Sequence, residues 1–262
     1  MTLVDELQVA VVIPARYASS RFPGKPLAML GGKPVLRWVT EAVSTREWDV
    51  FVATDDIRIA DAAEGWGSNV VFTSDDCQSG TDRCAEALRT LEREEDLRYD
   101  VVVNVQGDEP FVDPVQLRAL VDCFDDPSVQ IATLATPIRS VGELMSPNNV
   151  KVVVGDRGQA LYFSRQPIPY RRDAEPERWL DLGVYYKHVG VYAYRASVLQ
   201  AVCRLPQGAL EQAERLEQLR WLAAGHSIAV RVTPRANIGI DTPEDLAAAE
   251  AFIEQDKKKN EI

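Results

Sequence analysis

Apolar runs alternate with amphipathic stretches through the first half of the chain. Residues 9–15, 49–54 and 101–105 form short, valine-rich runs, which are typical of strands buried on both faces of a parallel sheet. Helical patterns follow these runs at residues 34–43, 56–64 and 114–124. The alternation predicts a doubly wound α/β core, in which helices cover both faces of a mostly parallel sheet.

The rhythm changes after about residue 145. Strands are predicted at residues 150–154, 160–164 and 187–194, and the stretch QPIPYRRDAEPERW separates the last two. We interpret the residues from about 145 to 195 as a small lobe inserted into a single domain of residues 1–262. A lid and a subunit contact are alternative roles for this lobe.

The α/β pattern resumes in the last part of the chain. It predicts a helix at residues 209–224, a strand at residues 226–233 and a final helix at residues 243–252. Asp241 or Thr242 is the expected N-cap of the final helix.

Composition narrows the classes of function. The chain has 262 residues, of which 46% are hydrophobic, and a formal net charge of -11. Its Lys and Arg residues form no stripe large enough to neutralise several phosphates of a nucleic-acid backbone. We therefore expect no nucleic-acid partner.

Cysteine and histidine usage argues against a zinc site, and nothing marks the chain for export. The four cysteines form no C-x-x-C pair, and the two histidines are far apart in sequence. The first residues, MTLVDELQ, lack the features of an export signal, and no apolar run approaches the ~20 residues of a membrane helix. We expect a cytoplasmic protein with reduced thiols and no membrane partner.

Ligands of open α/β sheets bind outside the carboxyl ends of the strands, so polar residues at these ends are the first candidates for a site. The segment PARYASSRFPGKP, residues 14–26, follows the first strand and carries Arg16, Arg21 and Lys25 among small residues. Two guanidinium groups and one ammonium group on such a loop suit a triphosphate. The segment has no Walker A pattern, and a solvated basic loop accounts for it equally well.

Two acidic residues also follow predicted strands. Asp108 lies in NVQGDEP, and Asp241 lies in NIGIDTPEDL. Mg²⁺ usually takes one or two protein carboxylates and completes its octahedron with phosphate oxygens and water, so both acids could serve one Mg²⁺ ion. Turn hydrogen bonds for Asp108 and helix capping for Asp241 are the simpler alternatives.

Together these segments resemble the 3-deoxy-manno-octulosonate (Kdo) cytidylyltransferases, also called CMP-Kdo synthetases. The resemblance extends from about residue 9 to 252 and rests, in order, on PARYASSRFPGKP, VATDD, CQSGTDR, NVQGDEP, VKVV, ALYFSRQPIPY, KHVGVYAYR, LEQLR and IDTPEDL. It implies an α/β fold of the nucleotide-diphospho-sugar-transferase type, a homodimer, a Mg²⁺ cofactor and a role in lipopolysaccharide biosynthesis.

The resemblance also assigns roles to individual residues. The CTP phosphates would be held by Arg16 and Lys25, with Arg21 in support, and the cytidine by Gln78, Ser79, Gly80 and Arg83. The Mg²⁺ ligands would be Asp108 and Asp241, which with Arg16 and Lys25 form the catalytic set. The acceptor would contact Gln106, Arg165, His188, Tyr192, Glu217 and Gln218.

The implied reaction is attack by the anomeric hydroxyl of Kdo on the α-phosphorus of CTP, which forms CMP-Kdo and releases pyrophosphate. Mg²⁺ would raise the acidity of that hydroxyl, because the sequence offers no evident protein base. The acceptor could instead be amino-Kdo, another ulosonic acid or a small phosphonate such as phosphonoformate. A non-catalytic, nucleotide-binding regulator is the alternative from another class.

Overall fold

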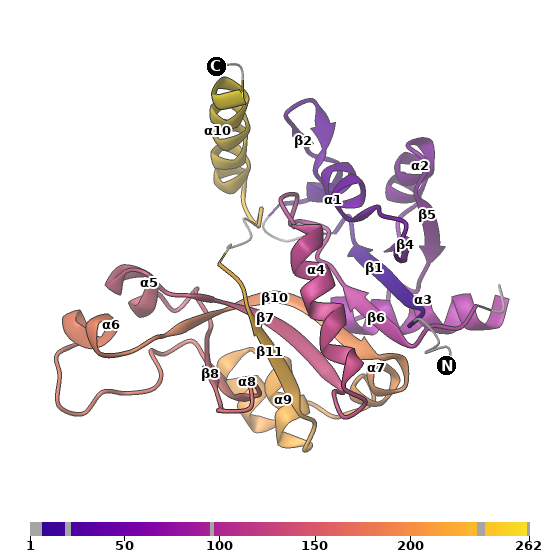
Figure 1. Cartoon of the computed structure of the whole chain (residues 1–262). Coiled ribbons are helices and arrows are strands. Elements are labelled where there is room, and N and C mark those ends of the chain that lie inside the picture. The colour runs from indigo at the N-terminus through magenta and orange to yellow at the C-terminus, as the bar shows by residue number, and fades with distance from the viewer. Residues whose placement is uncertain (1–6, 19–21, 95–96, 235–238, 261–262) are drawn as a thin grey trace, which may run out of the picture. The chain divides into compact units, whose positions relative to one another are not determined.

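The computed structural model describes residues 7–18, 22–94, 97–234 and 239–260, the last six of these without their side chains. The chain divides into two compact units, shown together in Figure 1. Unit 1 comprises residues 1–115 and 237–262, and unit 2 comprises residues 116–236. The single domain with a lobe at about 145–195 stays a prediction.

Unit 1 contains a four-stranded parallel sheet in the order β6-β1-β4-β5. Its elements are β1 (Val9–Ala15), η1 (Lys25–Leu27), β2 (Met29–Leu30), β3 (Lys33–Pro34), α1 (Val35–Val43), β4 (Asp49–Thr54), α2 (Ile57–Gly65), β5 (Asn69–Phe72), α3 (Gly80–Glu94), β6 (Val101–Asn104) and α10 (Pro243–Asn260). The chain runs from β1 to β4 to β5 and then returns to the other side of β1 to form β6. Right-handed crossovers therefore place α1 and α2 on one face and α3 on the other, which confirms the doubly wound prediction.

The reversal of direction creates a topological switch point between β1 and β6. In doubly wound sheets, ligands bind at such a point, outside the carboxyl ends of the strands. The two strands are held in parallel register from Val9 opposite Val101 to Val12 opposite Asn104. The residues that follow them, from Pro14 and from Val105 onward, therefore meet at one edge of the sheet.

Burial explains why the sequence forms these elements. Val11 and Val12 of β1 are completely buried, as expected for a strand covered on both faces. The predicted strands at 9–15 and 49–54 coincide with β1 and β4. The short strand β5 and the highly charged helix α3 were not predicted, although α3 buries Leu88 and Leu91 beneath the sheet.

A small apolar cluster joins α10 to the hairpin formed by β2 and β3. Leu30, Val35, Ile240, Ala249 and Ile253 form its buried part. The turn between the two strands places Gly31 at φ 56° and Gly32 at φ 88°, where a side chain would be strained. The two glycines thus form a tight turn in front of α1.

Unit 2 contains a mixed sheet in which β7 lies between β10, which is antiparallel to it, and β11, which is parallel. Strand β8 pairs antiparallel with both β10 and β9. The elements are α4 (Pro114–Val121), which begins in unit 1, η2 (Asp122–Asp125), β7 (Ile131–Pro137), α5 (Val141–Met145), β8 (Lys151–Val154), β9 (Ala160–Ser164), η3 (Pro176–Arg178), α6 (Trp179–Leu182), β10 (Tyr186–Arg195), α7 (Ala196–Val202), α8 (Ala209–Glu214), α9 (Gln218–Ala223) and β11 (Ile228–Val232).

The predicted helix at residues 209–224 is wrong, because the structure breaks it into α8 and α9. Arg215 adopts a left-handed conformation, with φ 54° and ψ 47°, which ends α8. The guanidinium group of Arg165 donates hydrogen bonds to the carbonyl oxygens of Glu214 (2.7 Å) and Arg215 (3.4 Å). These carbonyl groups are thus satisfied outside a continuous helix.

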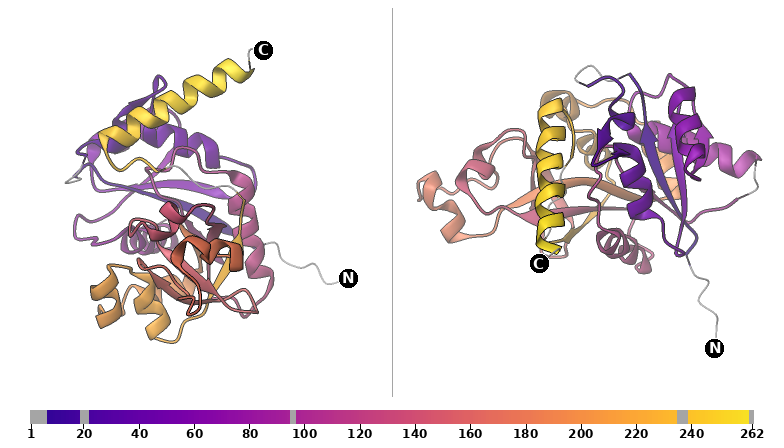
Figure 2. Two further views of the ribbon diagram at one scale, coloured as in Figure 1. Left: turned by 90° about the vertical axis from the view of Figure 1, so that its left-hand side faces the viewer. Right: turned by 90° about the horizontal axis from the view of Figure 1, so that it is seen from above.

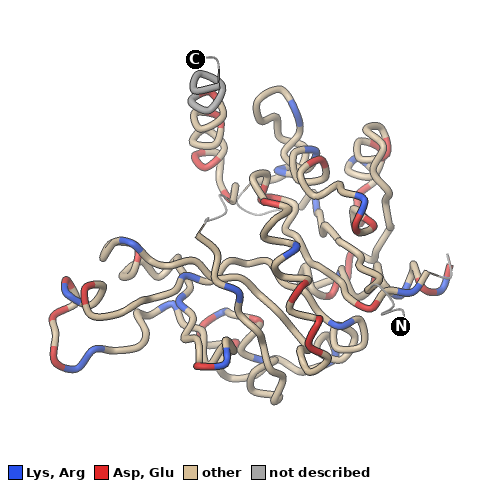
Figure 3. The backbone as a smooth tube through the Cα atoms, viewed as in Figure 1, with Lys and Arg blue, Asp and Glu red and all other residues tan. Residues whose placement is uncertain are grey.

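The helices α5 and α6 lie together at one end of unit 2, at the opposite end from α7 (Figures 1 and 2). A cluster of Ile138, Leu144, Trp179 and Tyr185 forms the core of this end. In the part of the chain that the structure describes, no helix has the length and apolar character needed to cross a membrane. Figure 3 shows that Lys and Arg, like Asp and Glu, are distributed over many elements rather than gathered on one of them.

Candidate nucleotide site at the switch point of unit 1

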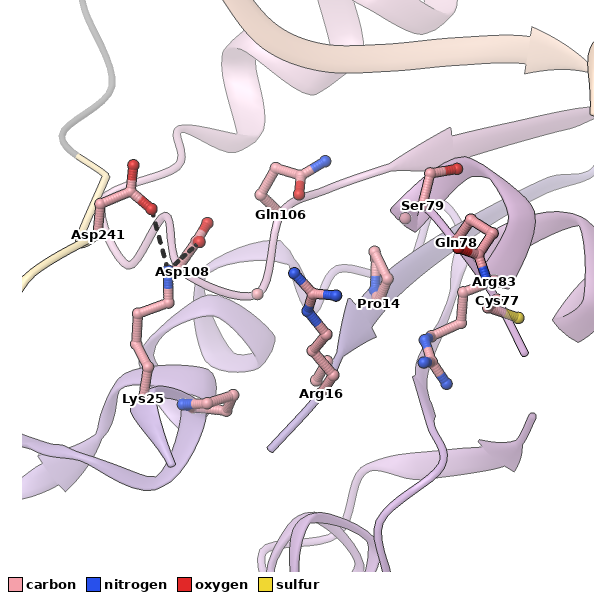
Figure 4. Close-up of a pocket in the computed structure, with 14 residues that line it drawn as sticks. Pro14, Arg16, Lys25, Cys77, Gln78, Ser79, Arg83, Gln106, Asp108 and Asp241 are labelled. Carbon is pink, nitrogen blue, oxygen red and sulfur yellow. Dashed lines mark hydrogen bonds and ion pairs between the residues drawn. The ribbon is translucent and has the colours of Figure 1, made fainter. Parts of the chain in front are cut away.

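A pocket in unit 1 lies at the switch point, where β1 and β6 end (Figure 4). It brings together most of the residues that the sequence nominates for nucleotide and metal, namely Arg16, Lys25, Gln78, Ser79, Gly80, Arg83, Asp108 and Asp241. It also contains Gln106, which the resemblance assigns to the acceptor. The predicted phosphate ligand Arg21 lies outside the described residues.

Lys25, Asp108 and Asp241 form one ionic group at one side of this pocket. The Lys25 Nζ lies 2.5 Å from Asp108 Oδ2 and 3.3 Å from Asp241 Oδ1. Lys25 is only 8% exposed, so its charge depends on these two carboxylates for compensation. The backbone N–H of Ile240 donates to the carbonyl oxygen of Asp108 (2.9 Å), which ties the two carboxylate-bearing segments together.

Thr242 and Asp245 make the capping hydrogen bonds at the start of α10. Thr242 Oγ1 accepts a hydrogen bond from the N–H of Asp245 (3.2 Å). The carboxylate of Asp245 in turn accepts from the N–H groups of Asp241 (3.0 Å) and Thr242 (2.9 Å). Thr242 therefore serves as the N-cap, reciprocated by Asp245. Asp241 directs its Oδ1 atom toward the Lys25 ammonium group.

Gly107 allows the ends of β1 and β6 to approach each other. A Cβ atom at Gly107 would lie 2.9 Å from the carbonyl oxygen of Pro14, a contact that needs backbone movement. The glycine between Gln106 and Asp108 thus sets how closely these side chains lie to the end of β1.

Arg83 and the start of α3 form the other side of the pocket. Arg83 is 4% exposed, and its guanidinium group contacts Asp55 Oδ2 (2.8 Å) and Thr73 Oγ1 (2.5 Å). Ser79 and Asp82 cap the helix reciprocally, since Ser79 Oγ accepts from the Asp82 N–H and Asp82 accepts from the Ser79 N–H, both at 3.1 Å. In Figure 4, Arg16 lies between this group and the Lys25 group.

Sequence reasoning did not assign Asp55 or Cys77 to the site. Asp55 directly follows β4, so its place at the carboxyl end of a strand was the available signal. Cys77 lines the pocket, and its thiol donates to Glu86 Oε2 at 3.2 Å. Burial and the neighbouring Glu86 carboxylate raise the pKa of the Cys77 thiol to about 12, so it remains protonated at neutral pH.

The other predicted acceptor residues belong to unit 2. His188 Nε2 lies 3.0 Å from Thr133 Oγ1, and that hydroxyl donates to the carbonyl oxygen of Val191 (2.8 Å). Nε2 therefore acts as the donor, which leaves Nδ1 as an acceptor. Burial lowers the pKa of His188 to about 3. Burial, and then the charge of Glu217, raise the pKa of Tyr192 well above its usual value, so both side chains are neutral.

The structure also describes the contacts of three more predicted acceptor residues, Arg165, Glu217 and Gln218. The Arg165 guanidinium group is engaged by carbonyl oxygens, including that of Pro147 (3.2 Å), rather than exposed for an anion. Glu217 accepts from Arg220 Nη2 (2.8 Å). The Gln218 Nε2 group is buried and makes no hydrogen bond with any residue that the structure describes.

The fold places a pocket lined by cationic side chains, two carboxylates and a helix N-terminus at the switch point of the sheet, an arrangement typical of nucleotide-binding α/β proteins. Residues 10–228 match the family model described as "Cytidylyltransferase". The chain is 54% identical over 247 residues to the 3-deoxy-manno-octulosonate cytidylyltransferase of Phocaeicola vulgatus, with 93% of this chain and 96% of that protein covered. The chain therefore belongs to the 3-deoxy-manno-octulosonate cytidylyltransferase group of the cytidylyltransferase family.

Two further similar proteins have names that state a sugar acid. The 8-amino-3,8-dideoxy-manno-octulosonate cytidylyltransferase of Shewanella piezotolerans is 45% identical, with 95% of this chain and all of that protein covered. A solved structure of CMP:2-keto-3-deoxy-manno-octonic acid synthetase complexed with CTP is 42% identical, with a TM-score of 0.86 over 95% of this chain and 99% of that one. The likeness to this structure extends through both units.

Proposed function

We propose that the protein transfers CMP from CTP to the anomeric hydroxyl of Kdo. The hydroxyl oxygen forms a bond to the α-phosphorus of CTP, the bond between the α-phosphorus and its bridging oxygen to the β-phosphorus breaks, and pyrophosphate leaves. The hydroxyl proton is released to solvent. The pocket that holds Arg16, Lys25, Asp108 and Asp241 together is the observation that carries this proposal.

In this proposal, Arg16 and Lys25 bind the phosphates of CTP. Arg16 is exposed within the pocket, so its guanidinium group is open to an incoming anion. Lys25 would exchange part of its contact with Asp108 and Asp241 for the phosphate oxygens. Neighbouring Gln78, Ser79 and Gly80 at the start of α3 would surround the cytidine, with Arg83 fixed beneath them by Asp55.

Asp108 and Asp241 fit a Mg²⁺ ion. Both carboxylates already converge on one cation, the ammonium group of Lys25, and carboxylate oxygens are the ligands that Mg²⁺ prefers. A Mg²⁺ ion bound there would supply a Lewis acid that stabilises negative charge on the phosphates. The two side chains, with exposures of 30% and 51%, are both accessible to an ion from solvent.

For the acceptor we propose, among the residues of unit 2, His188, Tyr192, Glu217 and Gln218. The contact of Gln106 in unit 1 with the acceptor stays a prediction. The buried, unpartnered Nε2 group of Gln218 supports this proposal, because burying a donor without a partner costs about 1–3 kcal/mol and a ligand hydroxyl would satisfy it. The acceptor Nδ1 of neutral His188 suits a second hydroxyl. For Arg165, the observed contacts favour holding the break between α8 and α9 over pairing with an anion.

The test is an acceptor screen with CTP and Mg²⁺ held constant. Pyrophosphate release should require Kdo, and amino-Kdo, another ulosonic acid and phosphonoformate should support slower release. Release with amino-Kdo alone would assign the chain to the activity named for its Shewanella relative. Absence of release with every acceptor, together with retained CTP binding, would support the regulator alternative instead.

We also propose a homodimer that forms through the end of unit 2 that carries α5 and α6. This end exposes several large apolar side chains, namely Met145 (47%), Tyr170 (75%), Leu182 (46%) and Val184 (62%). Light scattering should give twice the 29.1 kDa chain mass, and Val184→Glu should reduce it to the single-chain mass. A cytoplasmic location and a role in lipopolysaccharide biosynthesis stay predictions.

A further inference from the structure

Tyr17 links the backbone next to Arg16 with the backbone next to Lys25. It follows Arg16, and its carbonyl oxygen accepts a hydrogen bond (2.9 Å) from the N–H of Gly24, which precedes Lys25. This bond closes the base of the segment between the two cations. Gly24 adopts φ 73°, and a Cβ atom there would lie 3.0 Å from the Tyr17 ring. The position therefore requires glycine on both conformational and steric grounds.

Arg58, from the first turn of α2, covers the Tyr17 ring. The guanidinium carbon lies 3.3 Å from the ring centroid, a close stacking contact of the kind that planar Arg makes and Lys cannot. The contact links the base of the segment to a helix that packs against β4 and β5.

Asp56 fixes the guanidinium group of Arg58 in this orientation. Asp56 Oδ1 accepts from Arg58 Nε (2.9 Å), and Oδ2 accepts from Nη2 (2.6 Å), which is a bidentate pair. Asp56 Oδ1 also accepts from the backbone N–H of Arg58 (2.9 Å), so the same residue is the N-cap of α2. The hydrogen bond from Arg58 lowers the pKa of Asp56, which keeps the carboxylate charged.

We propose that Arg58, held by Asp56, is a positioning residue for the nucleotide, because its stack on Tyr17 maintains the spacing of Arg16 and Lys25. The inference rests on the proposed use of CTP. Arg58 acts before the nucleotide arrives, since phosphate-binding side chains whose backbone is already held in place lose less conformational entropy on binding. The benefit is the same in the ground state and the transition state, so it affects KM for CTP and leaves kcat unchanged.

The first experiment measures the steady-state kinetics of substitutions at both members of the stack. Arg58→Ala and Tyr17→Leu should each raise KM for CTP about two- to fivefold, the range expected for an exposed stack of this kind, with kcat retained. Tyr17→Phe keeps the ring and should behave as wild type. The double variant should be no worse than the single variants, because both remove one contact.

Arg58→Lys separates positioning from charge. It preserves the positive charge near the pocket but loses the planar stack and the bidentate pair, so it should resemble Arg58→Ala. Wild-type KM in Arg58→Lys, or additive effects in the double variant, would overturn the proposal. Arg37→Ala is the matched control, because Arg37 is also an exposed arginine paired with an acid, Glu41, on a helix of unit 1.

The second experiment needs no nucleotide. Hydrogen exchange at the Gly24 amide should accelerate several-fold in Arg58→Ala relative to wild type and to Arg37→Ala. Unchanged exchange at Gly24 would reject the stack as the source of order. If the wild-type protein failed to bind CTP, the proposed function would fail, while the exchange result would still decide whether Arg58 orders the segment.

Discussion

The Lys25 ammonium group pairs with the carboxylates of Asp108 and Asp241, which lie far apart in sequence. Substitution of either aspartate should therefore have a large effect. We expect Asp108→Asn and Asp241→Asn each to lower the rate of pyrophosphate release by at least ~10²-fold, because each removes charge that acts directly at the phosphates. Asp125→Asn, at an exposed position of η2, is the control. A variant of either pocket residue that retained half of the wild-type rate would contradict the shared role.

His188 should make the protein sensitive to mild acid. Its pKa is about 3 in the folded protein and about 6.5 in the unfolded chain. Between these values the unfolded chain binds a proton that the folded protein does not, so the free energy of unfolding falls as the pH is lowered below 6.5. At pH 5 the loss would reach about 2 kcal/mol.

Denaturant titrations of wild type and His188→Gln at pH 7.5 and pH 5 measure this effect. The wild-type free energy of unfolding should fall by up to about 2 kcal/mol more than that of the variant over this interval. Equal losses in the two proteins would show that His188 contributes nothing to the acid sensitivity.

Cys77 should resist alkylation although it lines the pocket. At pH 8, its raised pKa of about 12 leaves on the order of 10³-fold less thiolate than an ordinary cysteine would have. Iodoacetamide labelling followed by peptide mass spectrometry should therefore be slow in the native protein and fast in urea. Glu86→Gln should accelerate native labelling, because it removes one cause of the raised pKa. Equal native and denatured rates would refute the prediction.

Some residues of the candidate site could be predicted from the sequence, and others could not. Arg16 and Asp108 could be nominated because they lie in the loops that follow strands, and parallel strands present their carboxyl ends at one edge. The choice between Asp241 and Thr242 as the helix cap was open, because both side chains can accept from a helix N-terminus. Only the reciprocal bonds of Asp245 decide it.

At the scale of the elements, Gly107 allows the loop after β6 to lie close to the end of β1. Gly107→Ala should destabilise the protein by about 1–3 kcal/mol and lower turnover, because the new Cβ atom would be forced against the backbone of Pro14. Gly142→Ala in α5 is the control, since a Cβ atom there meets nothing within 4 Å. Thermal unfolding of both variants tests this, and similar melting temperatures would contradict it.

The sequence pattern predicted β1 and β4 residue for residue, because most residues of both strands are buried and leave a strong apolar signal. It failed at α8 and α9, where the apolar stripe continues across the break. The break depends on the left-handed Arg215 and on the guanidinium group of Arg165, about 50 residues away in sequence. Local patterns carry no information about such a distant hydrogen bond.

For the molecule as a whole, bound nucleotide should stabilise the folded state by mass action. CTP at 100 times its dissociation constant would add about 2.7 kcal/mol, which corresponds to a rise in Tm of roughly 5–10 °C for a chain of this size. Differential scanning fluorimetry with CTP, UTP, ATP and GTP at one concentration measures it. The largest shift should come from CTP, and equal shifts for all four would contradict a base-selective pocket.

The chain completes unit 2 before it returns to unit 1, and this order affects how the protein is made. Asp108 and Asp241 are 133 positions apart (241 − 108), and unit 2 occupies most of that interval. At about 5–20 residues per second, the ribosome would need roughly 7–27 s to add Asp241 after Asp108. During that time Lys25 has only one of its two carboxylates, so the carboxylate pair that we propose for Mg²⁺ is complete only after unit 2 has been synthesised, even where the parallel sheet has already formed.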